Sequence, residues 1–287
     1  MRLATLHNED HMGWGVIHGD AVLLPPGDQA HLTTLQEIIE RGDPPAPDAG
    51  WTGIPLSEAQ LAAPIPSPRR NIMCLGMNYA EHAAESQRVK GDALKLPEAP
   101  VVFTKATTSV TGPYDDIPLD PAVTEQLDWE VELAVVIGRG GRHIPAERAL
   151  EHVFGYTVVN DLSARDLQFR HKQFFLGKSL DGGCPMGPWI TTADEIPNPH
   201  ALAISSRVNG ETKQDGTTAD MVFTIPEIIA TLSHILTLLP GDVIATGTPA
   251  GVGFARTPPE YLRPGDVVEC EVEGLGTLHN RIVAGGG

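Results

Sequence analysis

The stretch DWEVELAVVIG, residues 128–138, decides how the main part of this chain folds. Its second half is a short apolar run rich in β-branched residues and ends at a glycine, which predicts a buried strand. In its first half acidic and apolar residues alternate. Because side chains of a strand point alternately to its two faces, Asp128, Glu130 and Glu132 are predicted to share one face.

This row of carboxylates needs a partner. Two unpaired carboxylates roughly 7 Å apart along a strand repel by about 2 kcal/mol at an effective dielectric of 20. Residues 106–138 contain seven acids and no Lys or Arg, so the local sequence offers no cation. Mg²⁺, Mn²⁺ and Ca²⁺ all prefer carboxylate oxygen. The segment leaves two interpretations open, a divalent metal site and a solvated acidic edge strand.

The rest of the main part repeats short β-rich runs separated by Gly, Pro and Asp turns. These runs lie at residues 100–105, 132–138, 155–161, 188–192, 204–210, 242–248 and 266–274. Three helices are predicted between them, over residues 80–90, 163–174 and 225–236. We therefore expect an α+β fold that is predominantly β.

The first 68 residues differ in pattern. They predict a strand, a hairpin that turns near His18-Gly19-Asp20, and a helix from about Leu32 to Arg41. Two proline-rich stretches follow, and these suit irregular connections because proline fixes φ and lacks a backbone donor. We expect a small α/β N-terminal domain over residues 1–68 and a main domain over residues 69–287.

Composition excludes several classes of protein. The chain has 287 residues, 41% hydrophobic and 20% charged, as in ordinary soluble globular proteins. Its 20 basic and 37 acidic residues give a net charge of -17, which disfavours nucleic acid and anionic membrane surfaces as partners. No apolar run approaches the roughly 20 residues of a membrane helix, and Glu9 and Asp10 interrupt any secretory signal. Three scattered cysteines without a CxxC motif favour the cytoplasm.

Further candidate residues lie in GYTVVNDLSARDLQ, residues 155–168. Asp161 ends a buried strand, where it is either a third metal ligand or a turn-forming residue. Ser163 and Asp166 resemble a capping box that opens a helix. Arg165 and Gln168, three apart, share one face of that helix, and an arginine there suits a bidentate grip on a carboxylate substrate.

A possible acid–base pair lies elsewhere in the chain. His82 and Glu85 are i, i+3 on a short predicted helix, so the carboxylate can orient the imidazole as a base that activates water. A surface helical pair is the alternative. Lys178 lies in a turn-rich stretch and is a candidate ligand contact or a surface lysine. GxSxG, P-loop and GxGxxG motifs are absent, which argues against covalent serine catalysis and nucleotide binding.

Together these motifs resemble the fumarylacetoacetate hydrolase family, from about Asn71 to Ile282. The resemblance is carried by CLGMNYAEHAAE (74–85), VVFTK (101–105), GPYDDI (112–117), DWEVELAVVIG (128–138), FGYTVVNDLSARDLQ (154–168), GKSLDGGCPMGPW (177–189), VNGETKQDGTTADMVF (208–223), LPGDVIATGTPAGVG (239–253) and LRPGDVVECEVEGLGTLHN (262–280). It implies a mixed β-sandwich roll, commonly dimeric, so a homodimer is expected. Lys105-Ala106 departs from the Lys-Pro that is usual in the family.

The resemblance also implies roles for residues. Metal ligands would be Glu130, Glu132 and Asp161, holding Mg²⁺ or Mn²⁺, with Ca²⁺ as a further candidate. The catalytic residues would be His82 and Glu85, on a mobile lid, together with Lys178. Substrate contacts would be Arg165, Gln168 and Thr248. The substrate would be a small anionic keto acid.

On this basis we expect hydrolysis of the carbon–carbon bond of a 2,4-diketo acid. An acylpyruvate such as fumarylpyruvate or maleylpyruvate would give pyruvate and a carboxylic acid, in the catabolism of aromatic compounds. The same site supports oxaloacetate decarboxylation, or isomerisation and tautomerisation of keto diacids, because all of these reactions pass through metal-stabilised enolates. A non-catalytic metal-binding protein on the same fold is a remoter alternative.

Overall fold

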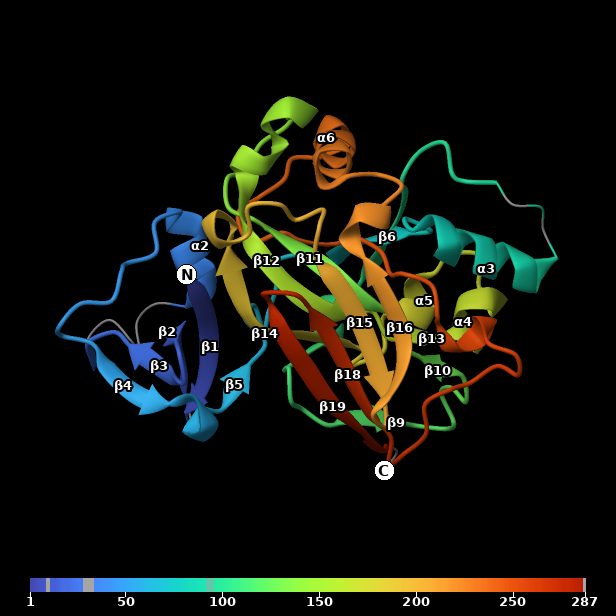
Figure 1. Cartoon of the computed structure of the whole chain (residues 1–287), viewed down its shortest axis with the longest axis horizontal. Helices are drawn as coiled ribbons and strands as arrows, with labels where there is room; N and C mark the ends of the chain where they lie inside the picture. Colours follow the sequence, from blue (N-terminus) through green and yellow to red (C-terminus); the bar gives the residue numbers. More distant parts are fainter. Residues whose placement is uncertain (9–10, 28–33, 92, 94, 286–287) are drawn as a thin grey trace.

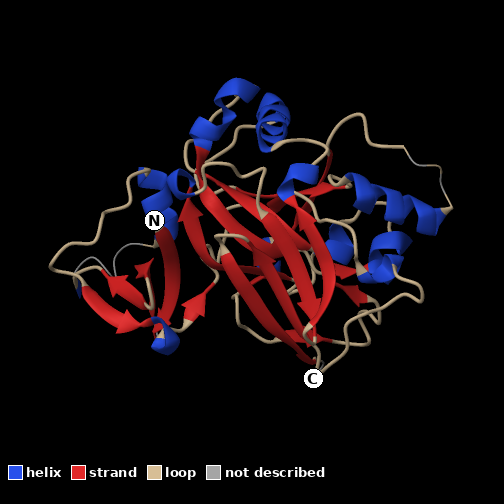
Figure 2. Cartoon of the chain, in the orientation of Figure 1, coloured by secondary structure: helices blue, strands red, loops and turns tan. Residues whose placement is uncertain are grey.

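The computed structural model describes residues 1–287 except 9–10, 28–33, 92, 94 and 286–287. Two β-sheets dominate it, and helices lie around their edges (Figure 2). The large sheet has the strand order β4 (Thr52–Pro55), β3 (Ala21–Leu24), β2 (His11–His18), β1 (Arg2–Asn8), β14 (Cys184–Thr192), β12 (Val153–Asn160), β11 (Val131–Ile137), β17 (Val243–Ala245), β6 (Ile72–Gly76), β7 (Val101–Lys105). Two short strands lie off this path, β5 (Leu61–Ala62) beside β1 and β8 (Val110–Thr111) beside β14.

The second sheet packs on the central strands of the first. Its order is β16 (Glu211–Thr217), β15 (Ala203–Val208), β18 (Val267–Val272), β19 (Gly276–Ala284), β9 (Ile117–Leu119). Strands β15, β18 and β19 lie against β11, β12 and β14 (Figure 1). Every residue of β11 and β12 is buried, because both faces of these strands are covered. The main part therefore has the mixed, mostly antiparallel β architecture that the sequence predicts.

Helices connect and cover the sheets. They are α2 (Leu35–Arg41), α3 (Ala80–Lys90), α4 (Arg165–Arg170), α5 (Phe175–Lys178) and α6 (Ile225–Ile235). Short 3₁₀ turns are η1 (Leu56–Glu58), η2 (Thr107–Ser109), η3 (Ala146–His152), η4 (Ala193–Glu195), η5 (Thr218–Asp220) and η6 (Gly253–Ala255). The predictions for α3 and α6 are confirmed to within one residue. Capping boxes open α2 at Thr34 and α6 at Thr224.

The helix predicted over residues 163–174 is wrong in part. Ser163 lies in the short strand β13 (Ser163–Ala164), which pairs with β10 (Leu127–Asp128), and α4 begins only at Arg165. The predicted capping box does not form. The Ser163 hydroxyl donates to the Asp161 carbonyl at 2.9 Å, and Asp166 accepts from the Thr124 hydroxyl at 2.6 Å. The partner of Ser163 is two residues away and that of Asp166 is 42 residues away, so neither makes the i, i+3 contact of a capping box.

The N-terminal strands extend the large sheet. Strand β1 pairs with β14 through Arg2–Thr191 and Leu3–Ile190, and Leu3 and Trp14 share a core with residues of β6 and β11. The hairpin turns at Gly19, as predicted, where φ is 59°. Helix α2 begins at Leu35, and residues 32 and 33 of the predicted helix lie outside the described residues. The boundary at residue 68 stays a prediction.

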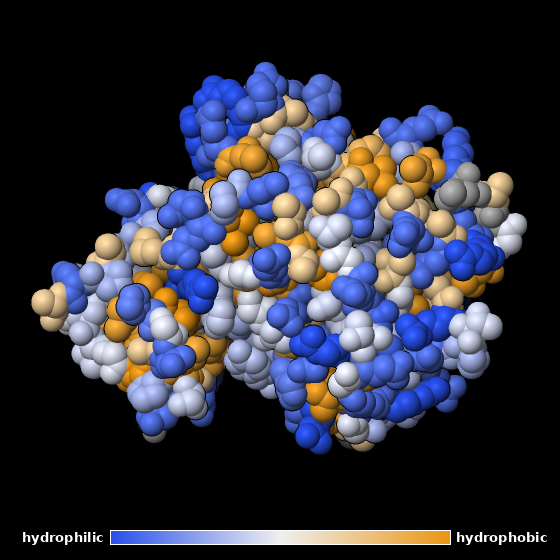
Figure 3. Space-filling view, in the orientation of Figure 1, coloured by the Kyte–Doolittle hydropathy of each residue, from blue (hydrophilic) through white to orange (hydrophobic). Residues whose placement is uncertain are grey.

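The surface agrees with the composition. Figure 3 shows a face that is hydrophilic over most of its area, with smaller apolar patches over the N-terminal strands and over parts of the main part of the chain. Within the described chain, no helix is long and apolar enough to cross a membrane. The expected homodimer and cytoplasmic location stay predictions.

Candidate active site

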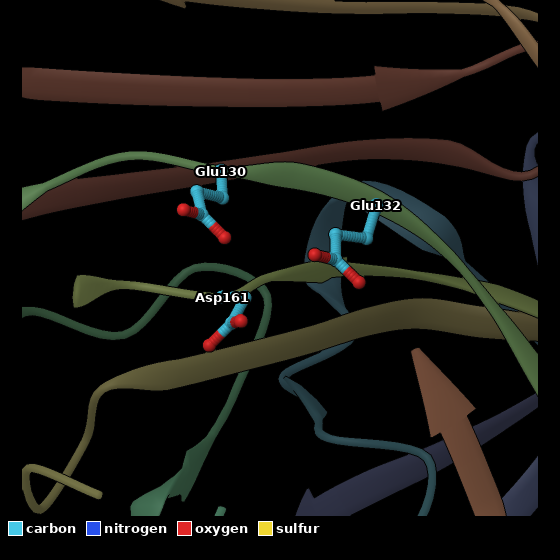
Figure 4. A group of neighbouring side chains, drawn as sticks. All are labelled: Glu130, Glu132 and Asp161. Carbon is cyan, nitrogen blue, oxygen red and sulfur yellow. The ribbon is translucent and has the colours of Figure 1, made fainter. Parts of the chain in front are cut away.

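Three acidic side chains converge at the junction of β11 and β12. Glu130 and Glu132 come from the start of β11, and Asp161 follows β12, its antiparallel neighbour (Figure 4). The Asp161 backbone N–H donates to the Glu130 carbonyl at 2.8 Å, which fixes the two residues opposite each other. One ligand oxygen from each of the three carboxylates lies within 4.8 Å of the others, and all three side chains are buried. The alternative of a solvated acidic edge strand is therefore wrong.

Cations from distant segments neutralise two of these acids. Lys178 Nζ lies 2.7 Å from Glu130 Oε2 and 2.6 Å from Asp161 Oδ2. Lys105 Nζ lies 2.6 Å from Asp161 Oδ1 and donates to the Leu162 carbonyl at 3.0 Å. Arg165 Nη2 lies 2.6 Å from Glu130 Oε1. The local sequence contains no partner for the acids, and folding supplies these three.

Glu132 remains without a cation among the described residues. It accepts a hydrogen bond from the Gly247 N–H at 2.8 Å. Burial, followed by repulsion from Asp161 and Glu130, raises its pKa well above the usual range. Burial alone would also raise the pKa of Glu130, but Lys178 and Arg165 outweigh burial and lower it. The cluster therefore holds one carboxyl that a further cation would stabilise as a carboxylate.

The donor set fits a hard divalent cation. The three side chains offer carboxylate oxygens only, which Mg²⁺, Mn²⁺ and Ca²⁺ prefer. A carboxylate oxygen accepts more than one interaction, so those already bonded to lysine keep a lone pair for a metal. We conclude that Glu130, Glu132 and Asp161 form a buried site that could bind a divalent metal.

Asp128 does not belong to this cluster, although period 2 placed it on the same strand face. Strand β10 ends at Asp128 and β11 begins at Val131, so the strand is interrupted between them. Asp128 instead pairs with Arg165 Nε at 2.8 Å and accepts from the N–H groups of Gly253 and Phe254 at 2.7 and 3.0 Å. It holds Arg165 and the 253–254 turn in place.

His82 and Glu85 form the pair that the helix predicts. His82 Nδ1 lies 2.8 Å from Glu85 Oε1, and Glu85 also accepts from the Gly251 N–H at 3.0 Å. An ionised carboxylate can only accept, which assigns the proton to Nδ1 and leaves Nε2 as the basic atom. His82 is buried, so the alternative of a surface helical pair is wrong.

One small cavity brings most of the candidate residues together. Its volume is about 60 Å³, and four phenylalanines line part of its wall. The candidate residues that line it are His82, Glu130, Glu132, Arg165, Gln168, Lys178 and Thr248. The other two, Glu85 and Asp161, contact His82 and Lys178.

Lys178 is buried among the acids of this site, so the alternative of a surface lysine is wrong. Only 2% of its surface is exposed. Burial alone would lower its pKa, but Asp161 and Glu130 outweigh burial and raise it, so the ammonium stays charged. Two of its three N–H groups face these carboxylates, which leaves the third for another acceptor.

Arg165 and Thr248 are more constrained than the sequence suggests. Arg165 donates to Asp128, to Glu130 and, through Nη1, to Gln168 Oε1 at 2.9 Å. One hydrogen on each Nη remains for a substrate. The Thr248 hydroxyl donates to the Val131 carbonyl and accepts from Gln214. Both residues line the cavity, and their roles in substrate binding stay predictions.

Sequence reasoning missed two residues of the site. In the sequence Lys105 stands out only because Ala106 follows it in place of the usual proline, yet its side chain is completely buried against Asp161. Asn78 bonds the carbonyls of Thr246 and Phe223 and accepts from the Phe223 N–H, which positions the 246–248 turn. The turn passes so close that a Cβ on Gly247 would lie 2.8 Å from the Asn78 Cβ. A charged residue at the end of the apolar strand VVFTK is the one available signal for Lys105.

Comparison with known proteins places this site in a family. Residues 71–283 match the family model described as fumarylacetoacetate (FAA) hydrolase C-terminal. The chain belongs to the fumarylacetoacetate hydrolase family. A solved structure, the fumarylacetoacetate hydrolase from psychrophilic Exiguobacterium antarcticum, is 41% identical with a TM-score of 0.88, and the match covers 99% of both chains.

Two curated relatives carry names that specify a reaction. Oxaloacetate tautomerase YisK of Bacillus subtilis (strain 168) is 51% identical over 253 residues, 88% of this chain and 82% of that protein. Human oxaloacetate tautomerase FAHD2A, a mitochondrial protein, is 43% identical over 95% of this chain and 87% of its own. Neither name denotes a hydrolase. The expectation of acylpyruvate hydrolysis is therefore wrong, and with it the basis for assigning aromatic catabolism.

Proposed function

We propose that this enzyme interconverts the keto and enol forms of oxaloacetate. The observation that carries the proposal is that His82 Nε2, which has no hydrogen-bond partner among the described residues, shares one cavity with Glu130, Glu132 and the charged Lys178. Tautomerisation requires a base that moves a proton and a cationic environment that stabilises enolate charge. It requires no attacking water and no broken carbon–carbon bond. The names of the relatives support the same reaction.

Glu130, Glu132 and Asp161 would hold Mg²⁺ or Mn²⁺. Bound there, the metal would act as a Lewis acid that favours the enolate charge of a 2-oxo acid. Lys178 contributes from the protein side. Its third N–H is free to donate to the oxygen on C2 of the substrate, where negative charge develops.

His82 carries the proton between carbon and oxygen. Nε2 accepts a proton from C3, and the electron pair of that C–H bond moves toward the C2 oxygen. The Nδ1–H bond to Glu85 stabilises the imidazolium that forms. Transfer of the proton from Nε2 to the C2 oxygen gives the enol and restores the neutral imidazole, so that no atom is gained or lost. The reverse sequence gives the keto form.

The wall of the cavity protects this exchange from water. Phe103, Phe169, Phe174 and Phe254 line it beside the charged groups. An apolar wall lowers the local dielectric, which strengthens the interactions of Lys178 and the acids with the substrate.

The decisive assay starts from enol oxaloacetate and follows the decay of its ultraviolet absorbance in the presence of Mg²⁺. We expect the enzyme to accelerate the decay without releasing pyruvate. The His82→Ala variant should lose the acceleration, whereas Glu81→Ala, an exposed position on the same helix, should keep it. Release of pyruvate at the rate of enol loss would identify a decarboxylase instead. No acceleration by the intact enzyme would refute the proposal.

A further inference from the structure

Ser86 presents an unused hydroxyl to the active-site cavity. It lies four residues after His82 on α3, so the two side chains share one face of the helix, and both line the cavity. Ser86 is 6% exposed, and within the described chain its hydroxyl has no hydrogen-bond partner. Ser233 on α6 shows the usual alternative, because its hydroxyl donates to the Ala230 carbonyl at 3.2 Å. The Ser86 hydroxyl is not used in this way, so it can donate to a ligand in the cavity that it lines.

Gln168 adds a second free donor to the same cavity. Its Oε1 accepts from Arg165 Nη1 at 2.9 Å, which turns the amide so that the Nε2 group faces away from the guanidinium. Asp128 and Glu130 hold Arg165 in place, and the amide orientation is fixed through it. Nε2 has no partner among the described residues. The cavity therefore contains two oriented donors, one from α3 and one from α4, that the scaffold does not use.

We propose that the Ser86 hydroxyl and the Gln168 amide bind the second carboxylate of a four-carbon 2-oxo diacid. The assignment rests on the proposed function. In the proposed binding mode, the 2-oxo acid end of the substrate lies at the acidic triad, and C3 of the substrate lies at His82 on α3. Ser86 is one helical turn, about 5.4 Å, beyond His82. The carboxylate attached to C3 reaches that turn.

This subsite makes the enzyme selective for diacids. The Arg165 guanidinium, bonded to Gln168, places positive charge behind the neutral donors. A 2-oxo acid of the same length without the second carboxylate leaves both donors unbonded. Loss of the Ser86 hydroxyl removes one bond to a charged group, which we expect to weaken binding about tenfold, equivalent to about 1.4 kcal/mol.

Binding of unreactive four-carbon acids tests the assignment without relying on turnover. Malate and 2-hydroxybutanoate share a 2-hydroxy acid end and differ in the second carboxylate. Titration calorimetry of the Mg²⁺-loaded enzyme should show tighter binding of malate. Ser86→Ala should weaken malate about tenfold and leave 2-hydroxybutanoate within about twofold. Arg88→Ala, at an exposed position of the same helix, is the matched control and should change neither.

Kinetics give a second readout. Ser86→Ala should raise the KM for oxaloacetate about tenfold with kcat nearly unchanged, because the hydroxyl binds a group that does not react. Alanine is favourable in helices, so the variant should keep its Tm. Equal affinity of malate for Ser86→Ala and the unmodified enzyme, or an equal loss for both acids, would overturn the assignment. Ser86-dependent preference for malate in an enzyme without tautomerase activity would support the subsite and refute only the proposed reaction.

Discussion

Lys105 offers the sharpest test of how this site balances its charges. The side chain is completely buried and bonds Asp161 Oδ1 at 2.6 Å and the Leu162 carbonyl at 3.0 Å. Lys105→Met keeps a chain of similar length and removes the charge. In the metal-free protein Asp161 then retains only Lys178 as a cationic partner.

The loss of stability that we expect from Lys105→Met depends on whether a metal is bound. Breaking a buried ion pair by removing one partner typically costs about 3–5 kcal/mol. At roughly 2–4 °C per kcal/mol for a chain of about this size, the metal-free variant should melt about 6–20 °C below the unmodified protein. A divalent cation supplies the charge that Lys105 no longer does. Mg²⁺ or Mn²⁺ should therefore stabilise Lys105→Met more than it stabilises the unmodified protein.

Thermal unfolding followed by circular dichroism measures this, with each protein in chelator and in excess Mg²⁺. Lys95→Met is the matched control, since Lys95 forms an exposed pair with Glu98, and it should leave both melting temperatures unchanged. The reasoning fails if Mg²⁺ raises the Tm of the Lys105→Met variant and of the unmodified protein by the same amount. It also fails if the metal-free variant has the same Tm as the metal-free unmodified protein.

Three further outcomes are expected. His82→Ala should lower kcat about 10²–10⁴-fold, the usual contribution of a general base, while calorimetry shows unchanged Mg²⁺ affinity; a parallel loss of affinity would contradict the assigned role. In the presence of chelator, Asp161→Asn should lower the Tm because it breaks the ion pairs with Lys105 and Lys178. Glu132→Gln should instead raise the Tm in chelator, and Mg²⁺ should no longer stabilise this variant. The pKa of Glu132 in the folded protein lies above the ordinary 4.5, so the free energy of unfolding of the metal-free protein should fall as the pH rises above that value. Glu132→Gln should lose less stability over the same pH range, and identical pH profiles of the two proteins would refute this reasoning.

Local patterns predicted the strands and made Glu130, Glu132 and Asp161 candidates, and the family resemblance then implied that the three act together as metal ligands. The runs of β-branched residues in β11 and β12 reflect burial on both faces, which composition reports directly. Glu130 and Glu132 are two apart, and Asp161 follows the next strand along the chain. Adjacent antiparallel strands bring such positions together, so the triad follows from strand order.

Contacts between distant segments could not be predicted in this way. Lys105 and Lys178 reach Asp161 from 56 and 17 residues away, and no spacing rule connects them. Asp128 was misplaced because the alternation of residues 128–132 assumes one unbroken strand. The capping box at Ser163 failed because residues 163–164 pair with β10 as a strand, so the helix begins only at Arg165. Asp128 and Asp166 found partners 37 and 42 residues away.

The reaction itself was the hardest property to predict. Base, lysine and metal ligands are common to hydrolysis, decarboxylation and tautomerisation, because all three pass through an enolate. What separates them is the binding of the rest of the substrate and the access of water. These depend on cavity residues such as Ser86, Phe169, Phe174 and Phe254, which the motifs do not include.

The balance of buried charge explains how an acidic protein could bind the dianionic substrate that we propose. The buried side chains of the site include four acids, Asp128, Glu130, Glu132 and Asp161, and three cations, Lys105, Arg165 and Lys178, an excess of one negative charge. The raised pKa of Glu132 favours a protonated carboxyl there in the metal-free site, which would offset this excess. A divalent cation displaces that proton and reverses the excess to one positive charge. Oxaloacetate, the substrate that we propose, has two carboxylates and would be attracted only to this second state. Metal binding and substrate binding are therefore coupled through Glu132, and both should strengthen as the pH rises and that proton is more easily lost.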